Sequence, residues 1–266
     1  MLAYYIHNLD PFLIHFSGNW GVRYYGLAYI LGFVAMYYGF LWFRKKGRSP
    51  LSAEQTADLL TWVVAGTLIG GRLGYCLLYD FHRTVADPLS VIAFWREGGI
   101  SGMASHGGMA GVVIAVVVFA RRQRVNFWQL ADNLATVAPV GLFFGRLANF
   151  INGELWGRPA TVPWAVIFPA ADSQPRHPSQ LYEALLEGAV LFVIMLWLRH
   201  KKTATGVPLL VFFVGYAVFR IVIECFREPD PQIGYYWGIA TQGQLLSLAL
   251  IILAGIFYRG KVHPQR

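Results

Sequence analysis

The residues best suited to chemistry in this sequence are arginines that lie inside long apolar runs. Arg220 lies in such a run, and polar side chains recur around it at intervals of three or four residues, at Tyr216, Glu224 and Arg227. This spacing places them on one face of a helix. Guanidinium groups bind phosphate or carboxylate oxygens through paired N–H donors. The pattern therefore predicts either an anion-binding helix face or one closed by internal salt bridges, such as Arg220 with Glu224.

A second apolar run carries a similar polar face. Arg146 and Asn149 are three residues apart in it, and Glu154 follows just after its end, while an earlier run contains Arg72. A charged side chain at membrane depth costs roughly 2.5–3.5 kcal/mol on insertion scales, so such residues usually face a cavity and have a partner. Arginines in separate runs, each with polar neighbours, favour an anion-binding interior over ion pairs alone. Its ligand is a phospholipid head group or another anion.

The remaining charged residues of these runs are expected to support that interior. Arg72, Glu224 and Arg227 are candidates for contacts with the binding residues rather than with the ligand itself. For Arg227, an internal salt bridge is as good an interpretation as a functional role.

One histidine is suited to proton transfer. His106 follows Ser105, precedes Gly107 and Gly108, and opens an apolar run. Glycines permit close backbone approach and unusual dihedral angles, and a helix N-terminus presents free N–H groups to anions. Histidine is the side chain whose charge ordinarily changes near neutral pH, so His106 is a candidate proton acceptor or donor. The alternative is a histidine that only forms a hydrogen bond in a helix-entry turn.

These residues must be positioned by helices that cross a membrane. Hydrophobic residues make up 56% of the 266 residues and charged residues only 14%, against roughly 25% charged residues in a soluble domain. A helix needs about 20 mostly apolar residues to cross the hydrocarbon core. We therefore predict an all-α polytopic membrane protein with about seven transmembrane helices, forming a single transmembrane domain over residues 1–266. The seven runs are 21–43, 57–79, 104–120, 127–150, 179–198, 207–227 and 238–258.

Three segments are expected to depart from simple spans. Segment 88–103 is apolar but too short to cross, which favours an interfacial or re-entrant position. The run at 104–120 is short and begins with His-Gly-Gly, so it is a candidate for a broken or re-entrant helix. The connection at about 151–178 is rich in Pro and Gly and predicts a small periplasmic cap or an ordered loop.

Small residues in the runs predict packing. Gly66, Gly70 and Gly74 recur at four-residue intervals, a spacing that lets helices approach closely. Cys76 and Cys225 lie in apolar runs without metal-ligand spacing, so we expect small packing residues and neither a metal site nor a disulfide framework.

The basic residues predict the orientation. The net charge is +8, but the basic clusters fall between apolar runs rather than along one face, which argues against nucleic acid as a partner. Cytoplasmic loops of membrane proteins are enriched in Lys and Arg, so the N-terminus is expected outside and the C-terminus in the cytoplasm. The basic loops follow the first, third, fifth and seventh runs and contain Arg44, Lys45, Lys46, Arg48, Arg121, Arg122, Arg124, Arg199, Lys201, Lys202, Arg259, Lys261 and Arg266.

Five segments of the chain resemble the bacterial prolipoprotein diacylglyceryl transferases. The segment GRLANFINGELWG, residues 145–157, closely resembles a long and specific signature of that family. The resemblance spans nearly the whole chain, and a mild departure occurs at Met109 and Ala110, where bulkier aliphatic residues are common. The other matching segments are VRYYGLAY (22–29), SHGGMAG (105–111), HPSQLYEALLEG (177–188) and GYAVFRIVIECFREPD (215–230).

The resemblance implies transfer of the diacylglyceryl group of phosphatidylglycerol to the lipobox cysteine thiol of a prolipoprotein signal peptide. The product is a thioether, and glycerol phosphate leaves; the setting is the bacterial inner membrane with its lipids, and no metal or other cofactor is expected. Catalytic positions implied by the resemblance are His106, Arg146, Arg220 and Tyr216. Positions implied for the phosphatidylglycerol head group are Arg146, Asn149, Arg220, Tyr25, Glu154 and Gly157.

The chemistry of this reaction leaves two mechanisms and two competing functions open. A thiol must be converted to thiolate, either by His106 as proton acceptor or by the positive field of the arginines with His106 structural. Arg146 and Arg220 are expected to stabilise the charge on the leaving phosphate. A transporter for an anionic solute also explains arginines at membrane depth. An intramembrane protease is less well supported, because Ser101 and Ser105 near His106 lie in no Gly-x-Ser-x-Gly pattern.

Overall fold

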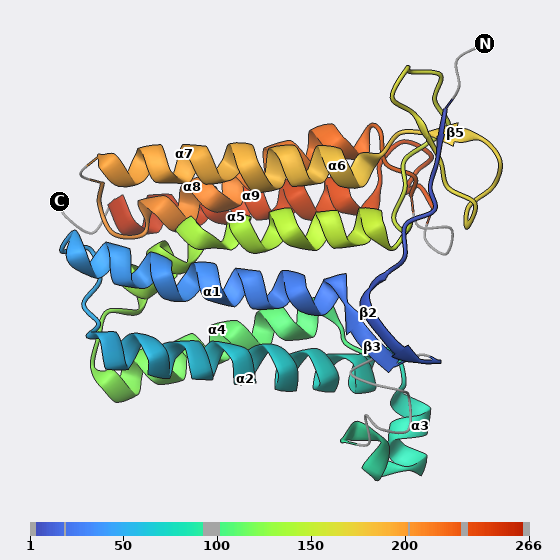
Figure 1. Cartoon of the computed structure of the whole chain (residues 1–266). Helices are drawn as coiled ribbons and strands as arrows, with labels where there is room; N and C mark the ends of the chain where they lie inside the picture. Colours follow the sequence, from blue (N-terminus) through green and yellow to red (C-terminus); the bar gives the residue numbers. More distant parts are fainter. Residues whose placement is uncertain (1–3, 19, 93–101, 202, 230–233, 263–266) are drawn as a thin grey trace. The chain divides into compact units, whose positions relative to one another are not determined.

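The computed structural model describes residues 4–18, 20–92, 102–201, 203–229 and 234–262, most of which are helical (Figure 1). Each predicted apolar run contains a helix whose ends lie within a few residues of the predicted ones. The sixth helix ends three residues before the predicted run does, and a turn follows it. The seventh helix begins and ends four residues later than predicted, because a turn precedes it. The helices are α1 (Tyr24–Lys45), α2 (Ala53–Leu78), α4 (Ser105–Gln123), α5 (Phe127–Ile151), α6 (Ser179–Glu183) continuing through the π-helical η3 (Ala184–Val190) into α7 (Leu191–His200), α8 (Val207–Glu224) and α9 (Gln242–Val262).

Within the described residues, six helical segments are long and apolar enough to cross a membrane. They are α1, α2, α5, the continuous α6–η3–α7 segment, α8 and α9, which confirms a mostly helical, multi-pass membrane protein. The helix α4 is not among the six, because its first turn holds Ser105, His106 and two glycines and its last turn holds Arg121 and Arg122. It is nevertheless continuous over Ser105–Gln123, so the break predicted near its start is wrong.

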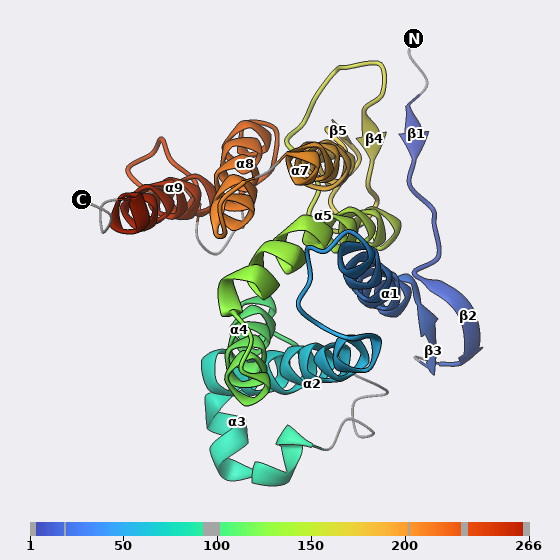
Figure 2. The same cartoon turned by 90° about the vertical axis from the view of Figure 1, so that its left-hand side faces the viewer.

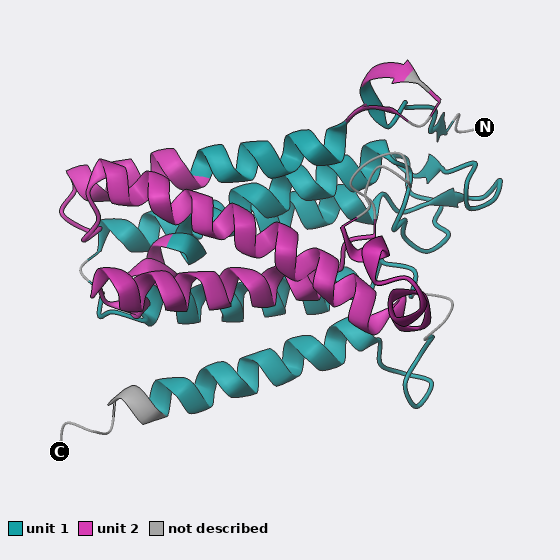
Figure 3. Cartoon of the chain, turned by 90° about the horizontal axis from the view of Figure 1, so that it is seen from below, with its two compact units in different colours: residues 1–13, 23–35, 134–266 teal, residues 14–22, 36–133 magenta. Residues whose placement is uncertain are grey.

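The chain divides into two compact units, which are coloured separately in Figure 3. The boundaries between them fall inside α1 and α5 and inside the strands β2 (Phe12–Ser17) and β3 (Trp20–Arg23), so each of these elements belongs partly to both units. Unit 1 comprises Met1–Leu13, Arg23–Ala35 and Leu134–Arg266, and unit 2 comprises Ile14–Val22 and Met36–Asn133.

In unit 2, α2 and α4 lie side by side with their backbones in close contact (Figures 1 and 2). A Cβ atom added to Gly66 would lie 2.6 Å from the carbonyl oxygen of Gly111, and one added to Gly74 would lie 2.7 Å from the Cα of Gly107. The prediction that Gly66, Gly70 and Gly74 permit close helix packing is therefore confirmed. Gly107, directly after His106, belongs to this contact and has an ordinary helical φ rather than the unusual dihedral expected for it.

Two short helices follow α2, namely α3 (Phe81–Ala86) and the 3-10 helix η1 (Pro88–Val91). The predicted interfacial segment 88–103 begins in η1, but its residues 93–101 lie outside the described residues.

In unit 1, α8 lies between α7 and α9 (Figure 2). Ala135 of α5 and Leu191 and Met195 of α7 form a buried core, against which partly buried side chains of α8 pack. The helix η3 also approaches α5 closely, since a Cβ atom on Gly188 would lie 2.7 Å from the Cβ of Phe143. This contact holds Glu187, directly before Gly188, near Arg146, which follows Phe143 on α5.

The connection between α5 and α6 is an ordered loop that includes a small sheet. The strand β1 (Tyr5–Ile6) pairs in parallel with β4 (Val166–Ile167), and β4 pairs antiparallel with β5 (Pro175–Arg176). Phe168, directly after β4, is fully buried against the rings of His7 and Trp156. A separate two-stranded sheet joins β2 (Phe12–Ser17) and β3 (Trp20–Arg23) just before α1.

Candidate active site

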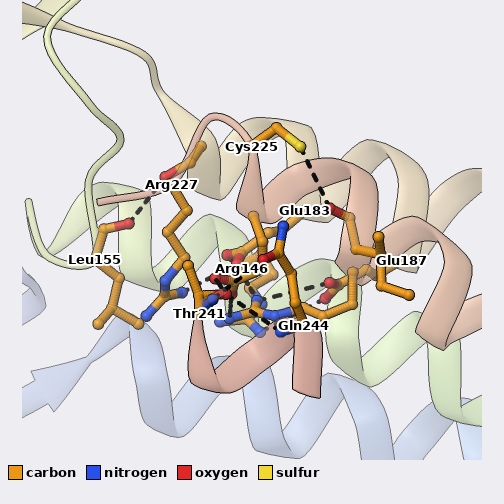
Figure 4. Close-up of polar contacts among 12 residues, drawn as sticks. Arg146, Leu155, Glu183, Glu187, Cys225, Arg227, Thr241 and Gln244 are labelled. Carbon is orange, nitrogen blue, oxygen red and sulfur yellow. Dashed lines mark hydrogen bonds and ion pairs between the residues drawn. The ribbon is translucent and has the colours of Figure 1, made fainter. Parts of the chain in front are cut away.

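Unit 1 contains six buried or nearly buried charged side chains that contact one another; we call them the arginine–glutamate cluster. They converge from α5, from the α6–η3 segment and from α8 and its C-terminal end (Figure 4). The side chains are between 0% and 17% exposed. Three cations face three carboxylates, so the formal charges of the cluster cancel. Its members are Arg146, Glu183, Glu187, Arg220, Glu224 and Arg227.

Glu183 is the centre of this cluster because it contacts all three arginines. Its Oε2 lies 3.2 Å from Nε of Arg146, and its Oε1 accepts a hydrogen bond of 3.0 Å from Nη1 of Arg227. Nη1 of Arg220 donates to the same Oε1. Removing a partner from a buried ion pair leaves an uncompensated charge, typically at a cost of about 3–5 kcal/mol. Glu183 therefore holds the three guanidinium groups at fixed positions.

Glu224 connects the cluster to the start of α9. Its Oε1 lies 2.5 Å from Nη2 of Arg220, and its Oε2 accepts a hydrogen bond of 2.6 Å from the hydroxyl of Thr241. The salt bridge between Arg220 and Glu224, one alternative in the sequence, is therefore present. Arg227 also forms an ion pair, but with Glu183.

Glu187 is the carboxylate with the weakest contacts. Its Oε2 lies 3.5 Å from Nη2 of Arg146, and its Oε1 lies 3.7 Å from Nη1 of Arg220. Neither oxygen accepts a hydrogen bond from any described residue, although the side chain is 0% exposed.

A second group of polar side chains joins the cluster through Arg146. Nη1 of Arg146 donates to Oδ1 of Asn149 at 3.4 Å, and Nδ2 of Asn149 donates to Oε1 of Glu154 at 2.8 Å. The hydroxyl of Tyr25 donates to the same Oε1 at 2.6 Å and also contacts Nδ2 of Asn149. The structure therefore brings Tyr25, Arg146, Asn149 and Glu154 together, as one binding site would require.

Gly157 lies where three backbone segments meet. Its N–H donates to the carbonyl oxygen of His177 at 2.9 Å, and a Cβ atom on it would lie 2.6 Å from the carbonyl oxygen of Phe226. It forms an isolated antiparallel bridge with Arg227. Only glycine fits this position, which ties the loop after Glu154 to the backbone of a cluster arginine.

Arg176 stabilises the same loops outside the membrane-spanning helices. Its Nη2 lies 2.6 Å from Oδ2 of Asp172, while its Nη1 donates to the carbonyl oxygen of Gly157 and to Oε2 of Glu228, each at 3.1 Å. The hydrogen bond from Arg176 lowers the pKa of the Asp172 carboxyl, and burial lowers the pKa of the neighbouring His177.

Tyr216 lies one turn before Arg220 on α8, as the sequence spacing predicts. Its ring stacks on that of Phe212 at a centroid distance of 6.3 Å and packs against the core of unit 1. Its hydroxyl lies within electrostatic range of Glu187 and Arg220.

His106 and Arg72 belong to unit 2. His106 is exposed in the first turn of α4. The guanidinium of the buried Arg72 donates from Nε to the carbonyl oxygen of Val91 at 3.0 Å and from Nη2 to that of Ser90 at 2.5 Å. It also donates to Gly102 at 3.3 Å. Arg72 thus binds the backbone on both sides of segment 93–101.

Comparisons with known proteins identify the family. A family model described as prolipoprotein diacylglyceryl transferase matches residues 11–259. The chain belongs to this family. A phosphatidylglycerol–prolipoprotein diacylglyceryl transferase of Rhizobium meliloti (strain 1021) is 45% identical over 258 residues, covering 92% of this chain and 89% of the relative. The similarly named proteins of Idiomarina loihiensis and Coxiella burnetii are 46% and 43% identical, covering 92% and 96% of this chain and 90% and 95% of those relatives.

Two charged residues at the centre of the arginine–glutamate cluster were not among the candidates from the sequence. Glu183 and Glu187 both lie in the predicted span 179–198, in the segment HPSQLYEALLEG. Their spacing of four residues, in a run without other charges before Arg199, is the same signal that singled out Arg220 and Glu224.

Proposed function

We propose that this chain transfers the diacylglyceryl group of phosphatidylglycerol to the lipobox cysteine of prolipoprotein signal peptides. The sulfur of the cysteine attacks a glycerol carbon, the bond from that carbon to the phosphate oxygen breaks, and a thioether forms as glycerol phosphate leaves. The thiol proton is released in the process. Membership of the family and the names of relatives that are 41–46% identical support this reaction.

The observation that carries the proposal for the site is the arginine–glutamate cluster. Arg146 and Arg220 lie in two different candidate membrane spans, α5 and α8. Both contact the carboxylates of Glu183 and Glu187. Preorganised guanidinium groups stabilise negative charge as it develops on a leaving phosphate. We assign this role to Arg146 and Arg220, with Tyr216 beside them.

The head group of phosphatidylglycerol is assigned to the neighbouring polar residues. Tyr25, Asn149 and Glu154 form one hydrogen-bonded group next to Arg146, which suits the hydroxyls of a glycerol. Gly157 contributes backbone at the same loop. Glu224 and Arg227 support the neighbouring cluster through their contacts with Arg220 and Glu183. Arg72 is assigned a supporting role within unit 2, where it binds the carbonyl oxygens of Ser90, Val91 and Gly102.

Removal of the thiol proton is assigned to His106. Its exposure at the first turn of α4 is compatible with access to a substrate. The competing mechanism relies on the positive field of the arginines alone, with His106 structural.

The chain is proposed to be one transmembrane enzyme domain of the bacterial inner membrane with seven spans. These are the six strongly apolar segments and, between α2 and α5 in the chain, α4. The basic loops then lie in the cytoplasm, with the C-terminus, while the N-terminus and the cap at 151–178 lie in the periplasm. The small sheet formed by β1, β4 and β5 gives this cap its ordered core.

The test of the proposed function uses purified protein, phosphatidylglycerol and a peptide with a lipobox cysteine. Mass spectrometry is expected to show the peptide gaining one diacylglyceryl group. Arg146→Ala and Arg220→Ala should each abolish or sharply reduce the gain, whereas Arg121→Ala, an exposed arginine at the end of α4, should leave it unchanged. Absence of the adduct with folded wild-type protein would refute the proposal.

A further inference from the structure

The formal charge of the arginine–glutamate cluster presents a problem for an anionic ligand. Arg146, Arg220 and Arg227 are balanced by three carboxylates, so the cluster is neutral before any ligand arrives. The phosphodiester of phosphatidylglycerol carries one negative charge. Binding it beside a neutral, buried cluster leaves that charge uncompensated, which a low-dielectric surrounding penalises strongly. Either a carboxylate must leave or one must become neutral.

Two of the three carboxylates are firmly engaged as anions. Glu183 contacts all three guanidinium groups, and Glu224 contacts Arg220 at 2.5 Å and accepts the hydroxyl of Thr241 at 2.6 Å. Protonating either one would remove short, charge-assisted contacts, which are among the strongest in proteins.

Glu187 differs from both. Its contacts with the arginines are 3.5 and 3.7 Å, and its two oxygens accept no hydrogen bond from the described residues. The groups that face it are Arg146 from α5, Tyr216 and Arg220 from α8, Glu183 on its own segment, and Arg227. The close contact of Gly188 with Phe143 holds this part of η3 against α5, so Glu187 cannot easily turn away. It is the carboxylate whose neutralisation breaks the fewest contacts.

We propose that Glu187 takes up a proton when the phosphodiester of an anionic lipid binds the arginine–glutamate cluster, so that cluster and ligand together stay neutral. The positive charge of Arg146 and Arg220, which Glu187 contacts in the free protein, is thereby left to balance the phosphate, while Glu183 keeps both guanidinium groups in place. The choice of lipid rests on the proposed function, but the proton uptake does not require catalysis. By linkage, binding that takes up a proton weakens as the pH rises, by up to about tenfold per pH unit.

The experiment is calorimetric titration of the full-length protein in detergent with a short-chain phosphatidylglycerol. Titrations in buffers of different ionisation enthalpy give the number of protons taken up, and a pH series gives the slope of affinity. We expect about one proton per lipid for the wild type and none for Glu187→Gln, whose affinity should be flat with pH. The matched control is Glu228→Gln, which also removes the carboxylate partner of an arginine, Arg176, but outside the cluster. This variant should behave as the wild type. Two separate titrations identify the ligand. Proton uptake with soluble glycerol phosphate, a phosphomonoester, would assign the site to any phosphate group, and equal uptake with zwitterionic phosphatidylcholine would contradict the requirement for a net negative charge on the lipid.

The outcomes separate this inference from the proposed function. Wild-type binding without proton uptake, or the same pH slope in Glu187→Gln, would overturn the role of Glu187 even if the transfer assay succeeds. Proton uptake with phosphatidylglycerol would stand even if no lipobox peptide is modified. If Glu187→Gln fails to fold, infrared difference spectra of the wild type test the proposal instead. Protonation of Glu187 on lipid binding should produce the band of a protonated carboxyl group. Absence of this band would contradict the proposal.

Discussion

At the scale of single residues, the site is a set of arginines whose positions depend on carboxylates. Glu183 contacts three guanidinium groups at once, so each arginine is oriented by a shared partner before any ligand binds. Such preorganisation is what electrostatic stabilisation of a leaving phosphate requires, because the donors need not reorient during the reaction. The carboxylates therefore belong to the proposed chemistry as much as the arginines do.

The hydroxyl of Tyr25 can be removed with little change of shape by Tyr25→Phe. Glu154 then loses a donor at 2.6 Å and keeps Asn149 at 2.8 Å. A hydrogen bond to a charged group contributes about 1.5–3 kcal/mol, so we expect transfer to fall roughly 10–100-fold. Tyr29→Phe, one turn later and 53% exposed, is the matched control. Equal rates for the two variants in the peptide assay would argue against a role for Tyr25.

His106→Gln tests the proton acceptor. If His106 removes the thiol proton, the rate should drop by roughly 10²–10⁴-fold and lose its dependence on pH near neutrality. His82→Gln, in the exposed first turn of α3, should keep the wild-type profile. Unchanged activity and pH dependence in His106→Gln would instead favour activation of the thiol by the arginines alone.

Asp172 gives a pH dependence of stability that arises outside the membrane spans. The hydrogen bond from Arg176 lowers the pKa of Asp172 in the folded protein. Its contribution to the free energy of unfolding is therefore present above the unfolded pKa of about 3.9 and is lost as the pH falls through the folded pKa. Thermal unfolding should show Asp172→Asn less stable than the wild type near neutral pH, with the difference vanishing in acid. A constant difference across pH, or one equal to that of the exposed Asp58→Asn, would contradict this cause.

At the scale of the elements, hydrophobic runs predicted the helices but not the contacts that place the site. The run at 179–198 predicted one span, whereas the structure has a π-helical segment within it that carries Glu187 and Gly188. Periodicity gave no signal for this π-helical segment, and its close approach to Phe143 at Gly188 depends on which helices pack together. The small β1–β4–β5 sheet was missed for a similar reason, since each strand has only two residues and forms through distant pairing.

The contact of η3 with α5 makes Gly188→Ala a test of this packing. A Cβ atom there would lie 2.7 and 2.8 Å from the Cβ and Cα of Phe143, so the helices must separate. Overpacking of this kind costs about 1–3 kcal/mol, and the thermal transition in detergent should fall accordingly. Gly255→Ala on α9 meets nothing among the described residues within 4 Å and should be neutral or slightly stabilising. Similar transitions for both variants would show that the approach of η3 to α5 is not tight.

At the scale of the whole molecule, the sequence alone specified the arginines and the polar residues near them, because a charge in an apolar run has few structural explanations. It did not specify Glu183 as their common partner, since that depends on which helices pack together. It also did not predict that Arg72 would bind backbone carbonyls. An arginine in an apolar run gives the same sequence pattern whether its guanidinium group contacts a ligand or the backbone of a loop.

The topology depends on whether α4 crosses the membrane. With seven spans, the basic loops after α1 and after α7 lie on the same side; with only the six strongly apolar segments, they lie on opposite sides. Lys45 and Lys46 in one loop and Lys201 in the other favour the cytoplasm for both loops. We therefore expect α4 to cross the membrane, its lower hydrophobicity being offset by its close glycine-mediated packing on α2.

Cysteine labelling tests this topology in a protein with Cys76→Ser and Cys225→Ser. A single cysteine in either loop, Ser49→Cys or Ala204→Cys, should resist an impermeant maleimide in intact spheroplasts and react after permeabilisation. Gln174→Cys in the cap should react in both. Labelling of Ala204→Cys in intact spheroplasts, with Ser49→Cys protected, would mean that α4 does not cross.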